Sequence, residues 1–493
     1  MNIEGNKLAF REWTDRLSAF QLGLTMIGLD QDTAPKAGAA YRTEKRALLS
    51  AEYRKLLQDE KMFDILQELE ETGTGDEAMD AEVGLYLKRL RRERSVPIAA
   101  YVAFEKAKGT SSRIWHEARA QENYQILVPA LQNLIDAWRE VVSYWDSPLP
   151  LYDRMLDQHQ PGWTSCQYDA FFGAVRVRLI PLLQKIQEAP SPEEDFLHQF
   201  YPAEKQRLVM PKVCDLLGYT SDWGQLSESA HPLTTCVCQG DVRFSTKYRE
   251  NDVSQAILST AHESGHAWFG HQVDPAYDGS IIAHSISAGL HESQSRLVEN
   301  HIGRSFAFWE IVLPWLKEIF PDQLNAVSTE QFYRAVNTVH PSLVRTEADE
   351  VTYPLHIMIR YDIEKQFLGG DLKATDLEEV WNEQYKSVLG LTPEWPTQGI
   401  LQDLHWPYAY FGYFPTYALG SAFAAQFFTA LSRELDVPAL LKANQFPQIM
   451  TWLGEHVHRY GGLYLAEEVL QKATGEAFNP EYYLSYLERK YLR

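Results

Sequence analysis

Two histidines four residues apart, in His262-Glu263-Ser264-Gly265-His266, constrain this chain more than any other feature of its sequence. Residues four apart lie one above the other on an α-helix, so the two imidazoles point the same way and can bind one Zn²⁺ ion. Glu263 is offset by one position and can hold the metal-bound water rather than the metal itself. The alternative is two surface histidines on an amphipathic helix, and further ligands would decide between the two.

Helix signals flank this motif. Asn251 or Asp252 can cap the start of a helix, and Gly270 suits its end. The motif is therefore predicted to lie on one helix.

A third metal ligand is expected from a neighbouring helix, because a catalytic zinc takes three protein ligands and leaves a fourth position open. Glu292 follows in the sequence, in a predicted helix that Ser287 caps and Gly303 ends. Taken alone, Glu292 would be an ordinary solvent-exposed helix glutamate.

The composition excludes several classes of protein. Of the 493 residues, 45% are hydrophobic and 23% charged, which suits a globular core and excludes intrinsic disorder, collagen and small disulfide scaffolds. The formal net charge of -21 repels polyanions, so no nucleic acid partner is expected. The four cysteines contain no C-x-x-C pair and predict reduced thiols. Since the first ten residues lack the apolar stretch of a secretory signal, a cytoplasmic location is expected.

Residues 408–431 carry no formal charge over a length close to that of a membrane span. Tyrosines, Gly412, Pro415 and Gly420 crowd the first half of this segment. They favour a substrate-lining loop that leads into a buried helix from about Thr416, and no membrane association is expected.

The first 200 residues are mostly helical by pattern. Apolar residues at positions 13, 17, 20 and 24 fall on one face, which predicts a core-facing helix. A second helix is predicted from Thr43, as its N-cap, to Gly73, and a third ends before Pro97.

One segment, Thr234–Tyr248, has the alternation of a β-hairpin around a turn at Gln239-Gly240. No internal repeat and no Gly/Ser- or Pro-rich linker divides the chain. One domain is therefore expected over residues 1–493.

A set of motifs between residues 231 and 406 carries a resemblance to a known family. The motifs are His231-Pro232-Leu233, Asp241-Val242-Arg243-Phe244-Ser245, His262 to His266, His291-Glu292-Ser293-Gln294, Ile359-Arg360-Tyr361-Asp362, and Gly399 to Trp406 in the form Gly-x-x-Gln-Asp-x-His-Trp. With these motifs in this order, the chain resembles the carboxypeptidase Taq family of metal-dependent carboxypeptidases. It departs from the family pattern at Leu233, where the family has Phe, and at Ser245, where the family has Thr.

The resemblance implies a mainly α fold: a large single helical domain with a long central groove, zincin-like, with a small β-sheet beside the metal site. Residues 1–200 would form a wall and a lid, and residues 201–493 the metal site and the substrate groove. The implied activity is that of a zinc metallocarboxypeptidase, which releases single residues from the C-terminus of peptides with broad specificity. The resemblance also implies a homodimer, and a His₂Glu site accepts Co²⁺ as well as Zn²⁺.

The resemblance assigns roles to the site residues. His262, His266 and Glu292 become metal ligands, in agreement with their spacing. Glu263 becomes the general base that takes a proton from the metal-bound water and later delivers it to the leaving amine. His231 joins the candidates for substrate binding.

The reaction also needs a second donor for the oxyanion of the tetrahedral intermediate. Tyr413, Tyr417 and His405 are the candidates, in an aromatic-rich stretch that would otherwise indicate core. The sequence does not choose between the two tyrosines.

A carboxypeptidase must recognise a terminal carboxylate, which a guanidinium fits with two hydrogen bonds. Arg360 and Arg243 are the candidates, in that order. Because Arg360 lies in an apolar helix, the alternative is an internal ion pair with Asp362 or Glu364.

Two other functions stay open. An endo-oligopeptidase or dipeptidyl-type metallopeptidase on the same scaffold would share the zinc site and cut further from the chain end. A noncatalytic peptide-binding protein would keep the groove and lose the chemistry, although all three ligands and Glu263 are present.

Overall fold

The computed structural model describes residues 3–229 and 231–492. Over these residues the chain is mainly helical and contains one small sheet, as the sequence predicted. Residues 1, 2, 230 and 493 of the expected domain over 1–493 lie outside the described part of the chain.

The elements fall into three groups along the sequence. Before the sheet come α1 (Ile3–Thr33), α2 (Ala39–Leu57), α3 (Glu60–Thr72), α4 (Glu77–Ser95), α5 (Ile98–Ala120), α6 (Val128–Ser143), α7 (Leu151–His159), α8 (Ser165–Gln187), α9 (Ala203–Gln206) and α10 (Met210–Leu216). The strands are β1 (Gly224–Glu228), β2 (Leu233–Cys238) and β3 (Asp241–Thr246). After them come α11 (Gln255–Gln272), α12 (Ala288–Arg296), a π-helix (Leu297–Gly303), α13 (Phe306–Ile319), α14 (Pro321–Leu324), α15 (Thr329–Val336), α16 (Tyr353–Gly369), α17 (Leu377–Leu389), α18 (Pro415–Glu434), α19 (Val437–Lys442), α20 (Phe446–His456), α21 (Ala466–Thr474) and α22 (Glu481–Tyr491).

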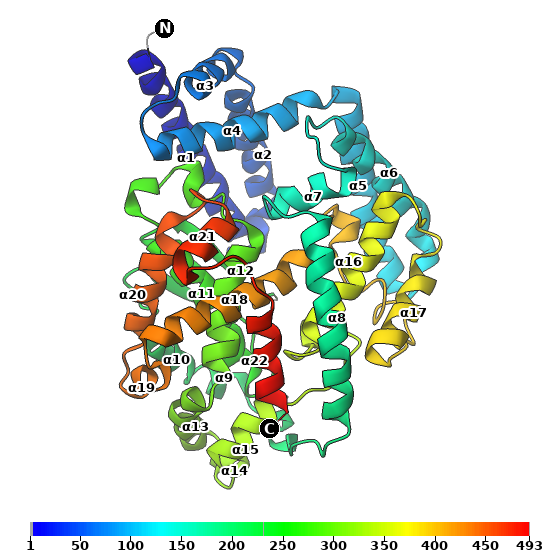
Figure 1. Cartoon of the computed structure of the whole chain (residues 1–493), viewed down its shortest axis with the longest axis vertical. Helices are drawn as coiled ribbons and strands as arrows, with labels where there is room; N and C mark the ends of the chain where they lie inside the picture. Colours follow the sequence, from blue (N-terminus) through cyan, green and yellow to red (C-terminus); the bar gives the residue numbers. More distant parts are fainter. Residues whose placement is uncertain (1–2, 230, 493) are drawn as a thin grey trace.

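Helices α1 to α4 lie at the upper left of the molecule in Figure 1. They share a core of their own, in which Trp13 and Leu17 of α1 pack with residues of α3 and α4. The single helix predicted over 43–73 is wrong. The side chain of Asp59 accepts a hydrogen bond from the Met62 amide and caps a new helix, so α2 ends and α3 begins at this point. The third predicted helix is confirmed as α4, which ends before Pro97.

The predicted hairpin is confirmed as β2 and β3, which pair antiparallel. The sequence did not predict β1, which pairs parallel to β3 and gives the order β1-β3-β2. Val242 and Phe244 of β3 are buried in a cluster with Ala267 of α11, so this face of the sheet packs against α11. Strand alternation sends Arg243 to the opposite face.

Three helices at the centre are α11, α12 and α18. At two positions they lie so close together that a residue with a Cβ atom does not fit. A Cβ on Gly265 of α11 would lie 2.7 Å from Ser295 Cα on α12, and a Cβ on Gly420 of α18 would lie 2.7 Å from Glu292 Cγ. Only glycine fits at these two contacts.

Helix α18 is the buried helix that was predicted to begin near Thr416. In the described part of the chain, no helix has both the length and the apolar character of a membrane span.

A buried carboxylate ties the loop before α18 to the body. Glu364 of α16 accepts hydrogen bonds from the Tyr152 hydroxyl at 3.0 Å, from Trp406 Nε1 at 2.6 Å and from the Gly412 amide at 2.6 Å. Burial raises the pKa of Glu364 to about 7, and the three donors offset only part of this effect. These hydrogen bonds anchor the loop before α18, which carries His405 and Tyr413, to α16.

As the pH rises from 5 to 8, we expect the free energy of unfolding to fall less in Glu364→Gln than in the wild type. The pKa of Glu364 in the folded state, about 7, lies above its ordinary value of 4.5. Such a carboxyl contributes stability below its unfolded pKa and loses that contribution as the pH rises through its folded pKa, whereas glutamine does not titrate. Denaturant titrations at each pH measure this, and the free energy of unfolding of the wild type minus that of the variant should fall as the pH rises. A difference that is the same at every pH would contradict the assignment.

Candidate active site

The structure brings His262, His266 and Glu292 together from α11 and α12. Their ligand atoms all lie within 4.8 Å of one another. Glu292 Oε2 is 3.4 Å from His266 Nε2 and 3.8 Å from His262 Nε2. Glu292 is buried and the two histidines are half-buried. Two imidazole nitrogens and one carboxylate oxygen that converge in this way are a donor set that suits a divalent metal such as zinc. The residues present therefore fit the metal that the motif predicts.

Each ligand is oriented by a neighbour. His262 Nδ1 lies 2.9 Å from Glu299 Oε2, so this nitrogen carries the proton and Nε2 is left for a metal. Arg296 Nε donates to Glu292 Oε1 at 2.8 Å. The His266 ring stacks on His291, with ring centroids 4.5 Å apart.

Sequence reasoning missed Glu299 and Arg296, which lie just after Glu292. Burial alone would raise the pKa values of both glutamates, but Arg296 lowers them, to about 2 for Glu299 and well below the ordinary range for Glu292. Arg304 is a second arginine close to Glu299, at 3.5 Å. The signal in the sequence was helical spacing, because residues four and seven after Glu292 return to its face.

Glu263 lies beside the ligands and turns toward the sheet. Its Oε2 accepts a hydrogen bond from Thr234 Oγ1 of β2 at 2.6 Å. Glu263, Thr234 and the three ligands line one cavity of about 630 Å³, which we call the catalytic cavity.

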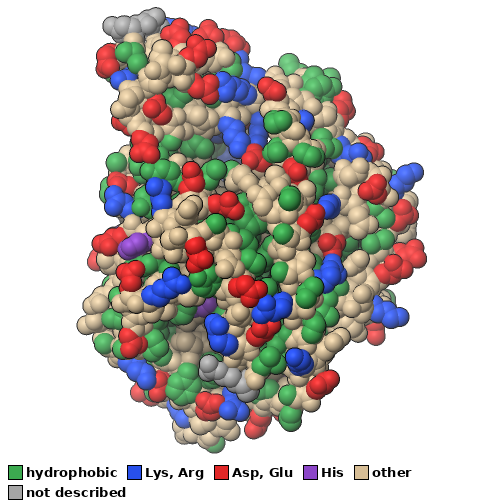
Figure 2. All heavy atoms as spheres, viewed as in Figure 1, with side chains coloured by type: hydrophobic (Ala, Val, Ile, Leu, Met, Phe, Trp, Pro, Cys, Tyr) green, Lys and Arg blue, Asp and Glu red, His purple; other side chains and the backbone are tan. Residues whose placement is uncertain are grey.

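Two further cavities continue the catalytic cavity into a groove. One of about 840 Å³, the N-terminal cavity, shares Gln158, His159 and Ile286 with it and reaches α4. Figure 2 shows Lys and Arg side chains gathered over α4, and Lys88, Arg89 and Arg92 line this cavity. The other, of about 720 Å³, shares His262 and Glu263 and is lined by Arg296, Arg304 and Arg345, so we call it the arginine cavity. The candidate metal ligands lie between the two, as the expected central groove requires.

The three candidates for oxyanion stabilisation take different places. Tyr413 and Tyr417 line the catalytic cavity. His405 is not among the residues that line it; His405 Nε2 lies 3.2 Å from the Tyr417 hydroxyl. Burial lowers the pKa of His405 to about 3, so its imidazole is neutral.

Arg360, the first candidate for binding the substrate carboxylate, is 0% exposed and does not reach the groove. Its Nε donates to Asp403 Oδ2 at 2.7 Å, and its Nη1 and Nη2 donate to the His356 carbonyl and to Gln402 Oε1. Arg360 is therefore an internal ion-pair residue in this structure. The partner is Asp403, and the expected pairing with Asp362 or Glu364 is wrong: Asp362 pairs with Arg176, and Glu364 accepts from other donors.

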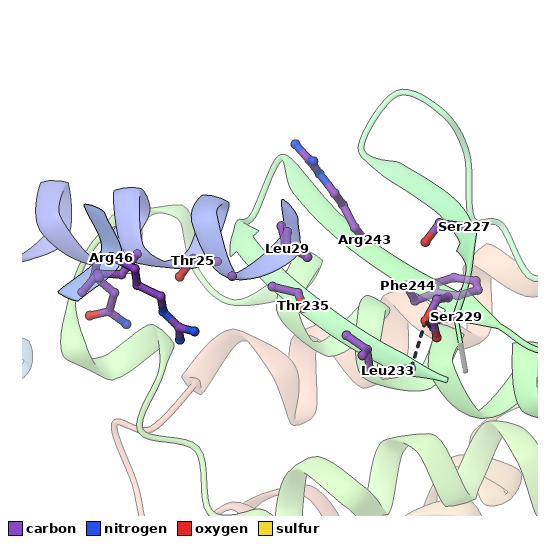
Figure 3. A pocket seen from close by; sticks show the side chains of 13 residues that line it. Thr25, Leu29, Arg46, Ser227, Ser229, Leu233, Thr235, Arg243 and Phe244 are labelled. Atoms are coloured by element: carbon purple, nitrogen blue, oxygen red, sulfur yellow. Dashed lines mark hydrogen bonds between the residues drawn. The ribbon is translucent and has the colours of Figure 1, made fainter. Parts of the chain in front are cut away.

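Arg243 and His231 also lie outside the catalytic cavity. Arg243 extends away from the sheet near the end of α1 that carries Leu29, as Figure 3 shows, and pairs through two bonds of 2.7 Å with Asp241. His231 is exposed just before β2, where its carbonyl accepts from the Ser229 hydroxyl.

Arg345 is a further residue that the sequence did not single out. It lies in the connection between α15 and α16 and lines the arginine cavity with Tyr353. Its Nε and Nη2 donate to Asp403 Oδ1 at 3.0 and 2.9 Å. Arg345 and Arg360 thus share one carboxylate. A single arginine in a loop carries no spacing signal, so only the folded chain reveals it.

We expect Gly420→Ala to weaken metal binding by about 10- to 100-fold, because the added methyl must displace Glu292. Alanine favours a helix, so α18 itself should persist. Metal content after equilibrium dialysis measures the effect. Gly173→Ala on α8 is the matched control, because a Cβ there meets nothing within 4 Å. Equal metal affinity in both variants would contradict the packing argument.

Comparison with known proteins gives matches over nearly the whole chain. The family model described as carboxypeptidase Taq (M32) metallopeptidase matches residues 10–491. Carboxypeptidase 1 of Bacillus subtilis (strain 168) is 35% identical over 495 residues, which cover 100% of this chain and 99% of that protein. Thermostable carboxypeptidase 1 of Thermus thermophilus is 34% identical over 501 residues, covering 99% and 98%. The crystal structure of the M32 carboxypeptidase from Deinococcus radiodurans R1 superposes with a TM-score of 0.95 at 32% identity and covers 99% of each chain. The chain therefore belongs to the carboxypeptidase Taq (M32) family of metallopeptidases.

Proposed function

We propose that this chain is a zinc-dependent carboxypeptidase that releases single residues from the C-terminus of peptides with broad specificity. Membership of the M32 family supports metal-dependent carboxypeptidase activity on peptide substrates. The observation that carries the proposal is one cavity lined by three metal-binding side chains, a glutamate beside them and two tyrosines.

We assign His262, His266 and Glu292 as the metal ligands. Zn²⁺ is the proposed ion, because two imidazoles and one carboxylate form a known catalytic zinc set, and Co²⁺ fits the same donors. When bound, the metal lowers the pKa of a coordinated water and polarises the scissile carbonyl.

Glu263 is the proposed general base. Its Oε2 is held by Thr234, while among the described residues no hydrogen bond occupies its Oε1. This oxygen can take a proton from the attacking water and give it to the amine nitrogen as the C–N bond breaks. The carboxylate is then ionised again at the end of the cycle.

Tyr413 is the proposed hydrogen-bond donor to the oxyanion. The Tyr417 hydroxyl already contacts His405, whereas the Tyr413 hydroxyl makes no hydrogen bond within the described part of the chain. Burial raises the pKa of Tyr413 to about 12, so its hydroxyl stays protonated and can donate.

Arg345 replaces Arg360 and Arg243 as the proposed partner of the substrate carboxylate. Asp403 faces two arginines, so this buried cluster carries one positive charge more than it has carboxylates. A buried charge without a partner is costly, and a substrate carboxylate in the arginine cavity would complete the pairing. Because this cavity shares His262 and Glu263 with the catalytic cavity, a carboxylate bound there lies near the bond to be cut.

Several other expectations stay predictions. They are the homodimer, the cytoplasmic location, the role of His231 in substrate binding, and the single domain over 1–493 in which residues 1–200 form a wall and a lid.

Digestion of a ten-residue peptide should give a ladder that shortens by one residue at a time from the C-terminus, as read by mass spectrometry. Internal fragments would favour an endo-oligopeptidase, and steps of two residues a dipeptidyl-type enzyme. Intact peptide with a metal-loaded protein would favour a noncatalytic peptide-binding protein.

Glu263→Gln should keep the metal and the fold and reduce turnover by about two to four orders of magnitude, because an amide cannot accept the proton. Turnover of the loaded variant, with its metal content and thermal midpoint, tests this. Glu292→Gln provides the contrast, since it should lose metal first and regain part of its activity in added zinc.

Arg345→Ala should lower kcat/KM on peptides with a free C-terminus by about 2 to 4 kcal/mol, the range for loss of a charged hydrogen-bonded partner. The loss should be much smaller on a C-terminally amidated analogue, which lacks the charge. Arg360→Ala should instead affect both substrates alike and lower the thermal midpoint. If Arg345→Ala shows that second pattern, Arg345 is structural and another group binds the carboxylate.

A further inference from the structure

We infer that Thr234 is a positioning residue that holds the carboxylate of Glu263 in its working orientation. The inference rests on the proposed role of Glu263 as the base. Thr234 Oγ1 lies 2.6 Å from Glu263 Oε2. An ionised carboxylate only accepts, so the threonine hydroxyl is the donor. A hydrogen bond to a charged group at this distance is among the stronger ones in proteins.

The sheet fixes the position of Thr234. It is paired with Phe244 of β3, and the Phe244 side chain is buried against α11. Thr234 Oγ1 also lies 3.1 Å from the main-chain oxygen of Glu263, so the hydroxyl sits directly over this turn of the helix. A β-branched side chain has few rotamers in a strand, so the hydroxyl cannot easily turn away.

Glu263 depends on this one contact for its orientation. Among the described residues, the only hydrogen-bond donor to its carboxylate is Thr234. The metal-binding side chains, by contrast, are oriented from α12 and the π-helix, by Arg296, Glu299 and His291. The proposed base is therefore held by strand β2, whereas the proposed metal ligands are held by α12 and the π-helix. Loss of the Thr234 hydroxyl should free the carboxylate to leave its productive geometry while the metal ligands stay in place.

Thr235, the next residue of β2, provides a matched control. It points to the opposite face of the sheet and lines the pocket beneath α1 that Figure 3 shows, away from Glu263. A Thr→Val change at either position removes one hydroxyl from the same strand with little change of shape.

The experiment compares Thr234→Val, Thr234→Ser and Thr235→Val in the metal-loaded full-length protein. Thr234→Val should lower kcat by about 10- to 100-fold, the effect of losing a hydrogen bond to a charged group, with KM within about twofold of the wild type. Its metal affinity and thermal midpoint should match those of the wild type. Thr234→Ser should recover most of the activity, and Thr235→Val should leave it unchanged.

A second comparison, made in a Glu263→Ala background, tests whether Thr234 acts through the base. Thr234→Val should cause no further loss there, because the group it positions is gone. The inference is overturned if the loss is as large as in the wild type, if serine fails to restore activity, or if Thr234→Val loses metal. Wild-type turnover in Glu263→Ala alone would instead overturn the proposed role of Glu263, and the inference with it.

Discussion

The close contact of three helices is the constraint on which the rest of this structure depends. The three side chains proposed to bind the metal come from α11 and α12, and they converge because Gly265 lets the two backbones approach and Gly420 leaves room for the Glu292 side chain. A protein interior is packed too densely to absorb a shift of this size, so these two glycines set the geometry of the site as directly as the ligands do. The buried helix α18 packs directly against the Glu292 side chain.

Buried charges divide the groove into regions of different character. At the proposed metal site, Glu292 and Glu299 face Arg296 and Arg304, so two carboxylates meet two guanidinium groups. Further along, Arg345 and Arg360 share the single carboxylate of Asp403. Among the described residues, six carboxylates and four arginines line the arginine cavity, so an anionic group there would depend on direct pairing with Arg345 rather than on the summed charge of the cavity.

Much of the site could be predicted from the sequence because its signals are local. The spacing of His262 and His266, the capped helix of Glu292 and the alternation of the hairpin each depend on neighbours in the chain, and the structure has all three. The two predictions that failed did so for different reasons. Strand β1 forms through a tertiary contact, its parallel pairing with β3. The helix predicted over 43–73 breaks at a local signal that was overlooked, the side chain of Asp59, which caps a new helix.

The arginines also show how far sequence motifs can be used. A motif singles out Arg360 as important, but it does not say whether Arg360 binds substrate or forms an internal ion pair. Gln402, Asp403 and Trp406 of the Gly-x-x-Gln-Asp-x-His-Trp motif hold Arg360, Arg345 and Glu364, so this motif builds the frame behind the cavity. Sequence pattern alone does not distinguish residues that support the cavity from residues that bind substrate.

The ion pairs around Glu292 also distinguish the three proposed ligands from one another. Arg296 donates to Glu292 Oε1, and Glu299 contacts His262 Nδ1, so these two side chains have partners within the chain. His266 Nδ1 has no hydrogen-bond partner among the described residues, and its ring stacks on His291. The ligands of a zinc finger, in contrast, gather only around the metal. Two of the three proposed ligands are therefore held by the chain itself, and the orientation of the third rests on ring stacking alone.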